Sequence, residues 1–484
     1  RTGMLSRALL LVALVAAAQA FTIPLQGIPR TQERANSLRR KIGLPSLRGN
    51  IQVMSETGGD YVATIMLDNN PFSVILDSGS SNLAVAGQSF GGVPQVYSSG
   101  GSTGTPISVQ YGSGSWTGTV YENQCSFDDS SQIDCKFAVI QSQSNFFNPP
   151  YLNSGIFGLA YQSIATNNIE PFLNQVTSNM GLSNFFSLQY CRSADWTQSY
   201  GAMTVGSTDY SLYSGSISYT SLTPPSGNYE YYTITVQSLM AGSTTASSGS
   251  ATMIVDSGTN SLVFESSIFN NIVSAVSSAT GLSSSNPGFS GQDFFCFSSK
   301  SEISQFPDIK VNILDSSYST FTLTIGSEHY MQYFGSASSS GKECFLFRIE
   351  NGNTLNILGT PTLNAYYVVF SKADSQVGFA PIAGCGTGAL AGANTVALPN
   401  DSTDSHPRST PPLSPPLSTH PRLPSPPLCL THGNRAYRAL RHRRGSRPRC
   451  HRRHCCRRGY LPPPPRRPQP AVRGDVRTSV RLPC

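Results

Sequence analysis

The sequence predicts a mostly β protein with two similar β lobes and a cleft between them. The chain is rich in Ser, Gly, Thr, Tyr, Phe and Val, and its short alternating apolar segments are typical of strands. One short pattern occurs twice, at residues 74–82 and again at 253–262. The length of 484 residues accommodates two domains or one large two-lobed β protein.

Each copy of the pattern is an apolar strand that runs into a tight turn and presents one carboxylate, Asp77 or Asp256. A single Asp-Ser-Gly is ordinary turn chemistry, because Gly permits a backbone reversal and Asp and Ser bond their own backbone. Its repetition in separate halves indicates a matched pair. The two stretches read Asp77-Ser78-Gly79-Ser80 and Asp256-Ser257-Gly258-Thr259.

We expect the two carboxylates to meet across the middle of the molecule and to share one proton. One then acts as a base and the other as an acid, which activates a water to cut peptide bonds without a covalent intermediate. The neighbouring hydroxyls have predicted roles. Ser78 and Ser257 lock the two turns together, and Ser80 and Thr259 orient the outer carboxylate oxygens.

The order of elements also repeats. Two apolar residues followed by Gly come after each aspartate, at Ile156-Phe157-Gly158 and Ile357-Leu358-Gly359, which indicates an internal duplication. We expect strands over 61–67, 72–76, 185–189, 203–206 and 231–239, and helices over 170–180 and 264–280 that end at Gly181 and Gly281.

Residues 107–120 read as a hairpin with a mobile glycine tip. Tyr111, Gly112 and Gly114 form its turn, and Trp116 follows on the second strand. The alternative is a plain surface hairpin.

Other hydrolytic chemistries lack support. Of seven histidines only His329 lies within 49–386, and no nucleophile motif, His-Glu-x-x-His motif or phosphate-binding Gly loop accompanies it. We expect no cofactor and no metal. The expected partner is a protein or peptide substrate bound in extended form, not a nucleic acid, and the expected state is a monomer.

Charge divides the chain into three parts. Residues 49–386 hold seven Lys and Arg against 22 Asp and Glu, whereas residues 1–48 and 387–484 are basic. The acidic body suits an enzyme that works at low pH, but charge alone does not separate this from a merely soluble acidic surface.

The sequence at the N-terminus predicts proteolytic processing, and the C-terminal residues differ in composition from the body. Residues 1–20 read as a signal peptide, and 21–46 as a basic prosegment with a processing site at 39–41, or else a disordered linker. The N-terminal lobe with Asp77 and the hairpin is expected over 47–220, and the C-terminal lobe with Asp256 over 221–386. The Pro- and Arg-rich residues 387–484 are expected to be a disordered tail or a translation artefact, with no function assigned.

No stretch outside the signal peptide has the ~18 apolar residues that a membrane-spanning helix needs, so no span is expected. The six cysteines within 49–386 favour an oxidising compartment of the secretory pathway: lysosome or vacuole, endosome or the extracellular space. Six cysteines allow 15 pairings, and their spacing does not choose among them.

Taken together, these motifs make residues 47–386 resemble the pepsin-like aspartic proteases, and the β-secretase (memapsin) branch in particular. The features that carry the branch resemblance are Ala84, Trp116 on the hairpin, and the stretches 47–49, 155–161, 170–172, 186–191 and 366–370. The resemblance implies a bilobal fold, acid endopeptidase activity, synthesis as a zymogen, and a flap on which Trp116 bonds Tyr111. It also implies Cys191–Cys385 and Cys296–Cys344 disulfides, which leaves Cys125–Cys135.

The sequence departs from that branch in three places. No membrane anchor follows the body, Ser78 stands where the family usually has Thr, and Val263 stands where β-secretases place an Arg that faces the substrate. Endopeptidase activity is therefore expected without the secretase substrate. The alternative is a catalytically inactive peptide- or protein-binding module on the same fold.

Overall fold

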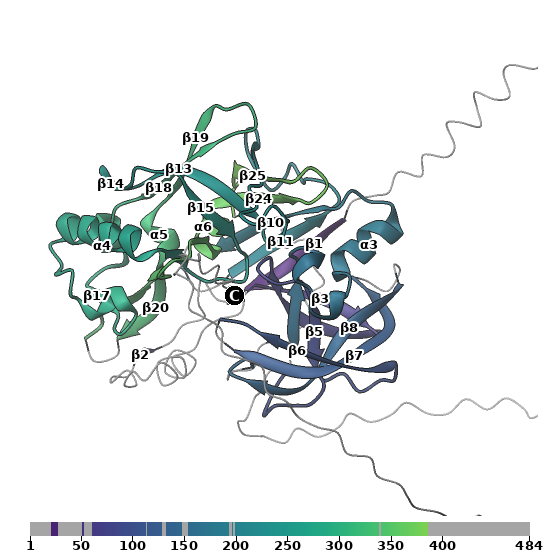
Figure 1. Ribbon diagram of the computed structural model, residues 1–484. Coiled ribbons are helices and arrows are strands. Elements are labelled where there is room, and N and C mark those ends of the chain that lie inside the picture. The colour runs from purple at the N-terminus through teal and green to yellow at the C-terminus, as the bar shows by residue number, and fades with distance from the viewer. Residues whose placement is uncertain are drawn as a thin grey trace, which may run out of the picture. The chain divides into compact units, whose positions relative to one another are not determined.

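The computed structural model describes residues 21–27, 51–52, 61–112, 114–127, 132–147, 153–192, 196, 199–337 and 340–385 (Figure 1). The predicted signal peptide, the processing site at 39–41 and the tail over 387–484 lie outside these residues, and so do Leu47-Arg48-Gly49. Their assignments stay predictions. The described residues belong to one compact unit.

Strands dominate the described residues and form three sheets, as the composition predicts. The 13-stranded sheet runs in the order β12 (Ser218–Ser221), β25 (Gln376–Pro381), β24 (Tyr366–Ser371), β10 (Phe185–Arg192), β11 (Ser199–Val205), β1 (Phe21–Gly27), β3 (Tyr61–Leu67), β4 (Asn70–Asp77), β9 (Gly155–Gly158), β5 (Leu83–Ala86), β8 (Ile133–Ser144), β7 (Ser115–Ser126) and β6 (Ser102–Gln110).

The other two sheets consist almost entirely of strands from the second half of the chain. The 8-stranded sheet runs β19 (Thr320–Ile325), β18 (Ile309–Leu314), β13 (Thr233–Ala241), β15 (Ala251–Val255), β23 (Ile357–Leu358), β16 (Leu262–Phe264) and β22 (Ile349–Asn351), with β14 (Thr244–Ser247) beside β13. The 4-stranded sheet runs β17 (Phe295–Phe297), β21 (Glu343–Phe347), β20 (Met331–Ala337) and β2 (Ile51–Gln52).

The internal duplication is visible in the strand register. In the first half, β4 runs parallel to β9 so that Asp77 lies opposite Gly158, and β5 pairs antiparallel with the same β9. In the second half, β15 runs parallel to β23, and β16 pairs antiparallel with β23. In each half, the short apolar strand of the apolar-apolar-Gly motif therefore lies between the aspartate strand and the strand that follows it.

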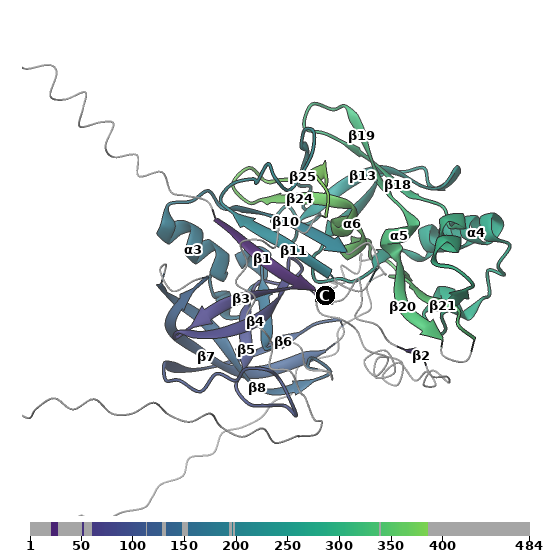
Figure 2. The same cartoon turned by 180° about the vertical axis from the view of Figure 1, so that it is seen from behind.

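The two halves share the 13-stranded sheet. The first-half strand β10 pairs with the second-half strand β24 from Phe185↔Ser371 to Leu188↔Val368. Figures 1 and 2 show β10, β11, β24 and β25 between the β5–β8 region and the region of α4 (Ser266–Thr280), β17 and β20. One continuous hydrophobic core contains side chains from both halves, including Phe186 and Phe370, whose rings stack at 4.8 Å. The halves are thus joined by backbone pairing and by packing.

Both predicted helices form, and both end at the predicted glycine. Gly181 after α3 (Phe172–Met180) and Gly281 after α4 have φ of 65° and 71°, in the left-handed region that favours Gly. The buried residues of α4 are spaced one turn apart, at Ile268, Ile272 and Val276. Shorter helices are α5 (Ser327–Tyr330), α6 (Thr360–Ala365), η1 (Gln162–Ile164), η2 (Thr166–Asn168), η3 (Pro287–Ser290) and η4 (Lys300–Gln305).

Among the strands that were not predicted, two come from the first 52 residues of the chain. β1, within the predicted prosegment, pairs with β11 over Phe21↔Val205 to Gln26↔Tyr200 and also with β3. β2, at the start of the predicted N-terminal lobe, pairs instead with β20 of the second half, at Ile51↔Ala337. Sequence reasoning missed β1 because the basic residues that follow it dominate the segment 21–46.

Candidate active site

The two repeated aspartates end their strands in one buried site. Asp77 is 6% exposed and Asp256 is 4% exposed. The two carboxyl groups lie within hydrogen-bonding reach of each other. Each is held by its own turn: the Gly79 N–H donates to Asp77 Oδ1 and the Gly258 N–H donates to Asp256 Oδ1, both at 2.9 Å.

A hydroxyl orients the second oxygen of each carboxylate. Ser80 Oγ donates to Asp77 Oδ2 at 2.5 Å, and Thr259 Oγ1 donates to Asp256 Oδ2 at 2.6 Å. The two contacts are equivalent in the two halves. Each carboxylate therefore has both oxygens positioned by its own loop, which limits its rotation.

The serines after the aspartates tie the two loops together reciprocally. The Ser78 N–H donates to Ser257 Oγ at 2.9 Å, and the Ser257 N–H donates to Ser78 Oγ at 2.8 Å. Each hydroxyl then donates to a carbonyl of the opposite strand, Ser78 to Val255 O and Ser257 to Leu76 O, at 3.1 and 3.0 Å. These four bonds cross the boundary between the halves and fix the separation of the two aspartates.

The glycines of the two turns allow the loops to approach closely. A Cβ on Gly79 would lie 2.8 Å from Asp256 Oδ2, and a Cβ on Gly258 would lie 2.2 Å from Asp77 Oδ1. Both separations are shorter than any normal contact to a Cβ. The repeated Gly is therefore required because each glycine faces the other half's carboxylate.

Burial raises the pKa of both carboxyls. Burial is the largest cause at Asp77, followed by the charge of Asp256. Burial also raises the pKa of Asp256, but hydrogen bonds from Thr259, Gly258, Asp77 and Gly79 offset part of the effect. More hydrogen bonds lower the pKa at Asp256 than at Asp77, which favours the charged form of Asp256.

A buried tyrosine pair that the sequence reasoning missed lies next to the two aspartates. Burial raises the pKa of Tyr190 well above its usual value, and the charges of Asp256 and Asp77 raise it further. The ring of Tyr190 stacks on that of Tyr61 at 3.7 Å. Tyr61 in turn donates to Asn364 Oδ1 at 2.8 Å and to the Cys191 carbonyl at 3.2 Å. Nothing in the spacing of these residues pointed to this contact.

The predicted hairpin forms from β6 and β7, with the Tyr111 N–H donating to Gly114 O at 2.7 Å. Trp116 Nε1 donates to the Tyr111 hydroxyl at 3.2 Å, and both side chains are buried. Phe146 stacks on the Tyr111 ring at 5.4 Å. Gly112 is also described in the turn, whereas Ser113 is not. A Cβ on Gly114 would lie 2.5 Å from Asn145 O, so the hairpin packs closely on the segment that follows β8.

Val263 lies on β16, opposite Glu350 of β22. Ser261, two residues earlier, donates to Glu350 Oε1. Position 263 therefore carries an apolar side chain opposite a carboxylate, not the Arg that β-secretases have there.

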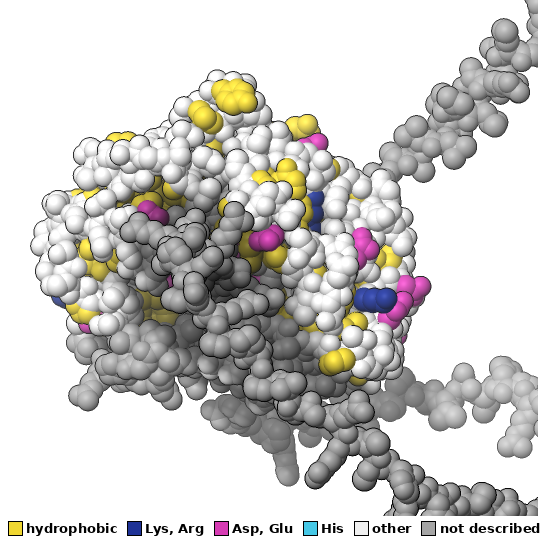
Figure 3. Space-filling model, in the orientation of Figure 1, with side chains coloured by type: hydrophobic (Ala, Val, Ile, Leu, Met, Phe, Trp, Pro, Cys, Tyr) yellow, Lys and Arg dark blue, Asp and Glu magenta, His cyan; other side chains and the backbone are white. Residues whose placement is uncertain are grey.

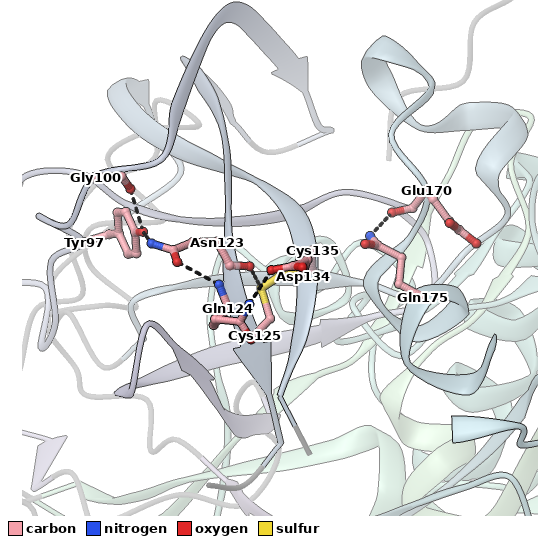
Figure 4. Close-up of a disulfide and its surroundings, with 9 residues drawn as sticks. All are labelled: Tyr97, Gly100, Asn123, Gln124, Cys125, Asp134, Cys135, Glu170 and Gln175. Atoms are coloured by element: carbon pink, nitrogen blue, oxygen red, sulfur yellow. Dashed lines mark hydrogen bonds between the residues drawn. A yellow bond between two sulfur atoms is a disulfide. The ribbon is translucent and has the colours of Figure 1, made fainter. Parts of the chain in front are cut away.

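Three disulfides are present in the described residues: Cys125–Cys135, Cys191–Cys385 and Cys296–Cys344. Figure 4 shows Cys125–Cys135 joining β7 to β8, beside a chain of hydrogen bonds through Asn123, Tyr97 and Gly100. Cys191–Cys385 spans 194 residues and joins β10 to the segment after β25. Disulfides of this kind fit a protein that folds in an oxidising, secretory compartment.

The described surface carries few charged groups. In Figure 3 only scattered Lys, Arg, Asp and Glu side chains interrupt an otherwise uncharged face. Among the described residues, no helix is long and apolar enough to cross a membrane. No group of three or more His, Cys, Asp and Glu side chains in this part of the chain is arranged to hold a metal ion.

The fold and the site define a two-lobed β protein with a facing pair of aspartates. The sequence profile of the family described as eukaryotic aspartyl protease matches residues 60–382, more than half of the chain. The chain therefore belongs to the eukaryotic aspartyl proteases, and the predictions of family and fold are confirmed.

Two relatives agree with this assignment. The chain is 24% identical to "Beta-secretase" of Strongylocentrotus purpuratus over 409 residues, 74% of each chain. It is 31% identical to "Pepsin A" of Suncus murinus over 341 residues, which cover 67% of this chain and 81% of that one. Membership of this family supports a hydrolase of the aspartic peptidase type that binds peptide substrates.

Proposed function

We propose that the protein is an aspartic endopeptidase that cuts peptide bonds in proteins with a water activated by Asp77 and Asp256. The observation that carries this proposal is the reciprocal geometry of the two loops, in which each aspartate faces the glycine of the other loop. Four hydrogen bonds between Ser78, Ser257 and the opposite strands hold that geometry.

The pKa shifts support one assignment of roles. Asp256, as the better stabilised anion, takes a proton from the water as the water oxygen attacks the peptide carbonyl carbon. Asp77 donates its proton to the carbonyl oxygen. When the C–N bond breaks, the leaving nitrogen receives the proton that Asp256 took from the water, and one hydroxyl of the gem-diol intermediate returns a proton to Asp77 as the new carboxyl group forms. The pair again holds one proton after products leave.

The flap supports binding of an extended peptide. Tyr111 and Trp116 bond each other on a hairpin whose turn contains Gly112 and Gly114. We propose that this hairpin closes over the substrate and that backbone near Gly79 and Gly258 pairs with the peptide as an added strand. The chain is proposed to act as a monomer.

Synthesis as a zymogen is the proposed role of residues 21–46. The pairing of β1 with β11 and β3 supports it, because a segment that is later removed then forms part of the central sheet. The proposed pH optimum is acidic, since the mechanism requires one of two closely spaced carboxyls to keep its proton. A lysosome or vacuole, an endosome or the extracellular space fits that optimum.

The test is cleavage of a protein substrate at pH ~4, chosen so that one carboxyl of such a pair is protonated and one ionised. We expect the full-length chain, after incubation in acid, to cut the substrate and to be blocked by pepstatin. Asp256→Ala is expected to melt as the parent does but to lose cleavage. Undiminished cleavage by purified Asp256→Ala would exclude the mechanism, and a folded parent without activity would favour the peptide-binding module.

A further inference from the structure

Residues 159–161, which follow β9, form a supporting segment that is bonded to the Asp77 loop. The Leu159 N–H donates to Asp77 O at 2.8 Å, and the Ala160 N–H donates to Ser80 O at 2.7 Å. The same Ser80 orients the Asp77 carboxylate through its hydroxyl. A displacement of the supporting segment would therefore move the hydroxyl that fixes one oxygen of the catalytic pair.

A cation from the second half of the chain bonds to this supporting segment. Lys372 directly follows β24, and its Nζ donates to Ala160 O at 2.8 Å. The same ammonium group donates to Asn174 Oδ1 of α3 at 2.9 Å, and it lies 5.5 Å from the centre of the Tyr161 ring. One side chain of the second half therefore contacts three residues of the first half.

The backbone of Lys372 is fixed as well. The N–H groups of Lys372 and Ala373 both donate to Asn184 O at 3.1 Å. Asn184 directly precedes β10, and β10 pairs with β24. The lysine side chain therefore starts from a held strand end and is bonded again at its tip, so that it can transmit a fixed position to Ala160.

Lys372 carries its charge under the conditions proposed for cleavage. Burial lowers the pKa of Lys372 to about 7, and the charge of Glu170 opposes this effect. The side chain is therefore an ammonium group in acid. Its bond to the Ala160 carbonyl is then charge-assisted, which makes it stronger than a bond between neutral groups.

The simpler role for Lys372 is to join the two halves of the chain. Two observations favour a role at the catalytic site. Both oxygens that accept from Nζ are neutral, so burial of this charge costs desolvation that an apolar side chain joining the halves would avoid. The carbonyl that it bonds also belongs to Ala160, whose own N–H holds Ser80. Three successive hydrogen bonds thus connect Lys372 to the Asp77 carboxylate.

We propose that Lys372 is a positioning residue for peptide cleavage. It holds Ala160, and through Ala160 it keeps the Ser80 hydroxyl where that hydroxyl orients Asp77. Lys372 acts through these residues and not by contact with the reacting atoms. This inference rests on the proposed endopeptidase function and adds a residue of the second half to the support of the first-half aspartate.

The test compares the acid-treated full-length chain with variants that separate the two bonds of Lys372. Lys372→Met removes both bonds, whereas Asn174→Ala removes only the bond to α3. Lys372→Arg keeps the charge and a donor, and Lys342→Met makes the matched change at an exposed lysine. Thermal unfolding measures the stability of each variant, and steady-state cleavage of one peptide measures kcat and KM.

We expect Lys372→Met to lower kcat about tenfold with less than about a twofold change in KM, because a misdirected Asp77 slows the chemical step and leaves the peptide-binding surfaces in place. Lys372→Arg should recover most of this loss. Lys342→Met and Asn174→Ala should keep the kcat of the parent, although Asn174→Ala should melt at a lower temperature than the parent.

The pH profile of kcat/KM gives a second readout, which a purely structural role of Lys372 would not move. The hydrogen bond from Ser80 lowers the pKa of Asp77. A displaced Ser80 should therefore raise the pH at which Lys372→Met loses the shared proton, and the fall in rate at high pH should move upward. Asn174→Ala should keep the profile of the parent.

A Lys372→Met chain that melts earlier but keeps the kcat and pH profile of the parent has lost only a structural tie, and this result overturns the positioning role. Equal losses of kcat in Lys372→Met and Asn174→Ala overturn it too. If Lys372→Met does not fold, Lys372→Gln, whose amide nitrogen is one bond closer to the backbone than Nζ, is judged by the same criteria.

Pepstatin affinity, measured by calorimetry, depends on the aspartate pair but needs no cleavage. We expect Lys372→Met to weaken it and Asn174→Ala to leave it unchanged. If the parent cuts nothing but its pepstatin affinity follows this pattern, the proposed function is rejected and the positioning role is retained. If the parent cuts peptides and Lys372→Met matches it in both kcat and pepstatin affinity, the function stands and the positioning role is rejected.

Discussion

At the scale of single residues, the account depends on one proton shared by two buried carboxyls. Asp77 and Asp256 are each bonded by a turn N–H and by a hydroxyl, so neither rotates freely. These partners were predictable because they lie within three residues of each aspartate. Tyr190 was not, because only the folded chain brings it close to the two aspartates.

The shared proton predicts a stability change with pH. In the folded chain, the pKa of Asp77 is raised above the ~3.9 of an ordinary aspartate in an unfolded chain. The protonated Asp77 therefore contributes its full stability below the unfolded-state pKa, and this contribution is lost as the pH rises through the folded-state pKa. Between pH 4 and pH 8, urea unfolding should show the parent losing at least about 1.4 kcal/mol relative to Asp77→Asn. Replacing the exposed Asp293 by Asn should leave the pH dependence unchanged. If the unfolding free energies of the parent and of Asp77→Asn change with pH in the same way, the two carboxyls do not hold a shared proton.

Because the two aspartate loops lie so close together, adding one methyl group at Gly79 should strongly reduce activity. Because a Cβ at Gly79 would lie 2.8 Å from Asp256 Oδ2, Gly79→Ala should displace that carboxylate and lower kcat/KM by about 100-fold. Exposed Gly249 has nothing within 4 Å of an added Cβ, so Gly249→Ala is the matched control. Peptide cleavage by the two folded variants gives the comparison, and equal activity would show that the loops are further apart than described.

At the scale of elements, the hairpin of β6 and β7, which is the proposed flap, is held by a hydrogen bond between two of its own side chains. Trp116 donates to the Tyr111 hydroxyl, and Phe146 packs on the same ring. The hairpin was predictable from its glycines and alternating residues. The Phe146 contact was not, because it comes from the segment after β8.

Removing the hydrogen bond between Trp116 and Tyr111 should weaken substrate binding more than it slows the catalytic step. Trp116→Phe and Tyr111→Phe each delete one partner of a bond worth ~1 kcal/mol, so each should raise KM about fivefold with a smaller change in kcat. The double variant should be no worse than the more impaired single variant, because both act on one bond. Steady-state kinetics of the three proteins measures this, and strictly additive losses would mean that the two residues act separately.

Helix ends and strands differed in how well the sequence predicted them. The ends of α3 and α4 were predicted because Gly181 and Gly281 have a local conformational cause. The strand β1 was missed because basic residues follow it and because its partners among the described strands, β11 and β3, are distant in sequence. Pairing between distant segments carries no local signal.

At the scale of the whole molecule, two duplicated halves are joined by a common sheet, by the serine bonds and by one long-range disulfide. The duplication was predictable from the repeated motifs, and the register of β4, β9, β15 and β23 agrees with it. The exchange of strands between halves was not predictable, because β2 and β24 pair across the expected lobe boundary.

The difference in loop length predicts that Cys191–Cys385 stabilises the folded chain more than Cys125–Cys135 does. Cys191–Cys385 closes a separation of 194 residues and Cys125–Cys135 one of 10. The chain-entropy estimate gives about 5 and about 2.7 kcal/mol for the two loops. Replacing both cysteines of each pair by Ser should therefore lower the unfolding free energy more for Cys191–Cys385, as measured by guanidinium denaturation. The reverse order would mean that strain or residual structure outweighs loop entropy.

The central claim is that a peptide bond is cut by two carboxyls that hold one proton between them. Its most direct test is the pH dependence of kcat/KM for peptide cleavage by the acid-treated full-length chain. We predict a bell-shaped profile whose upper limb lies well above the ordinary pKa of a carboxyl group, because the rate falls when the pair gains a second proton and again when it loses the shared one. A rate that rises with pH to a plateau above neutrality would indicate a single base and would contradict the shared-proton mechanism.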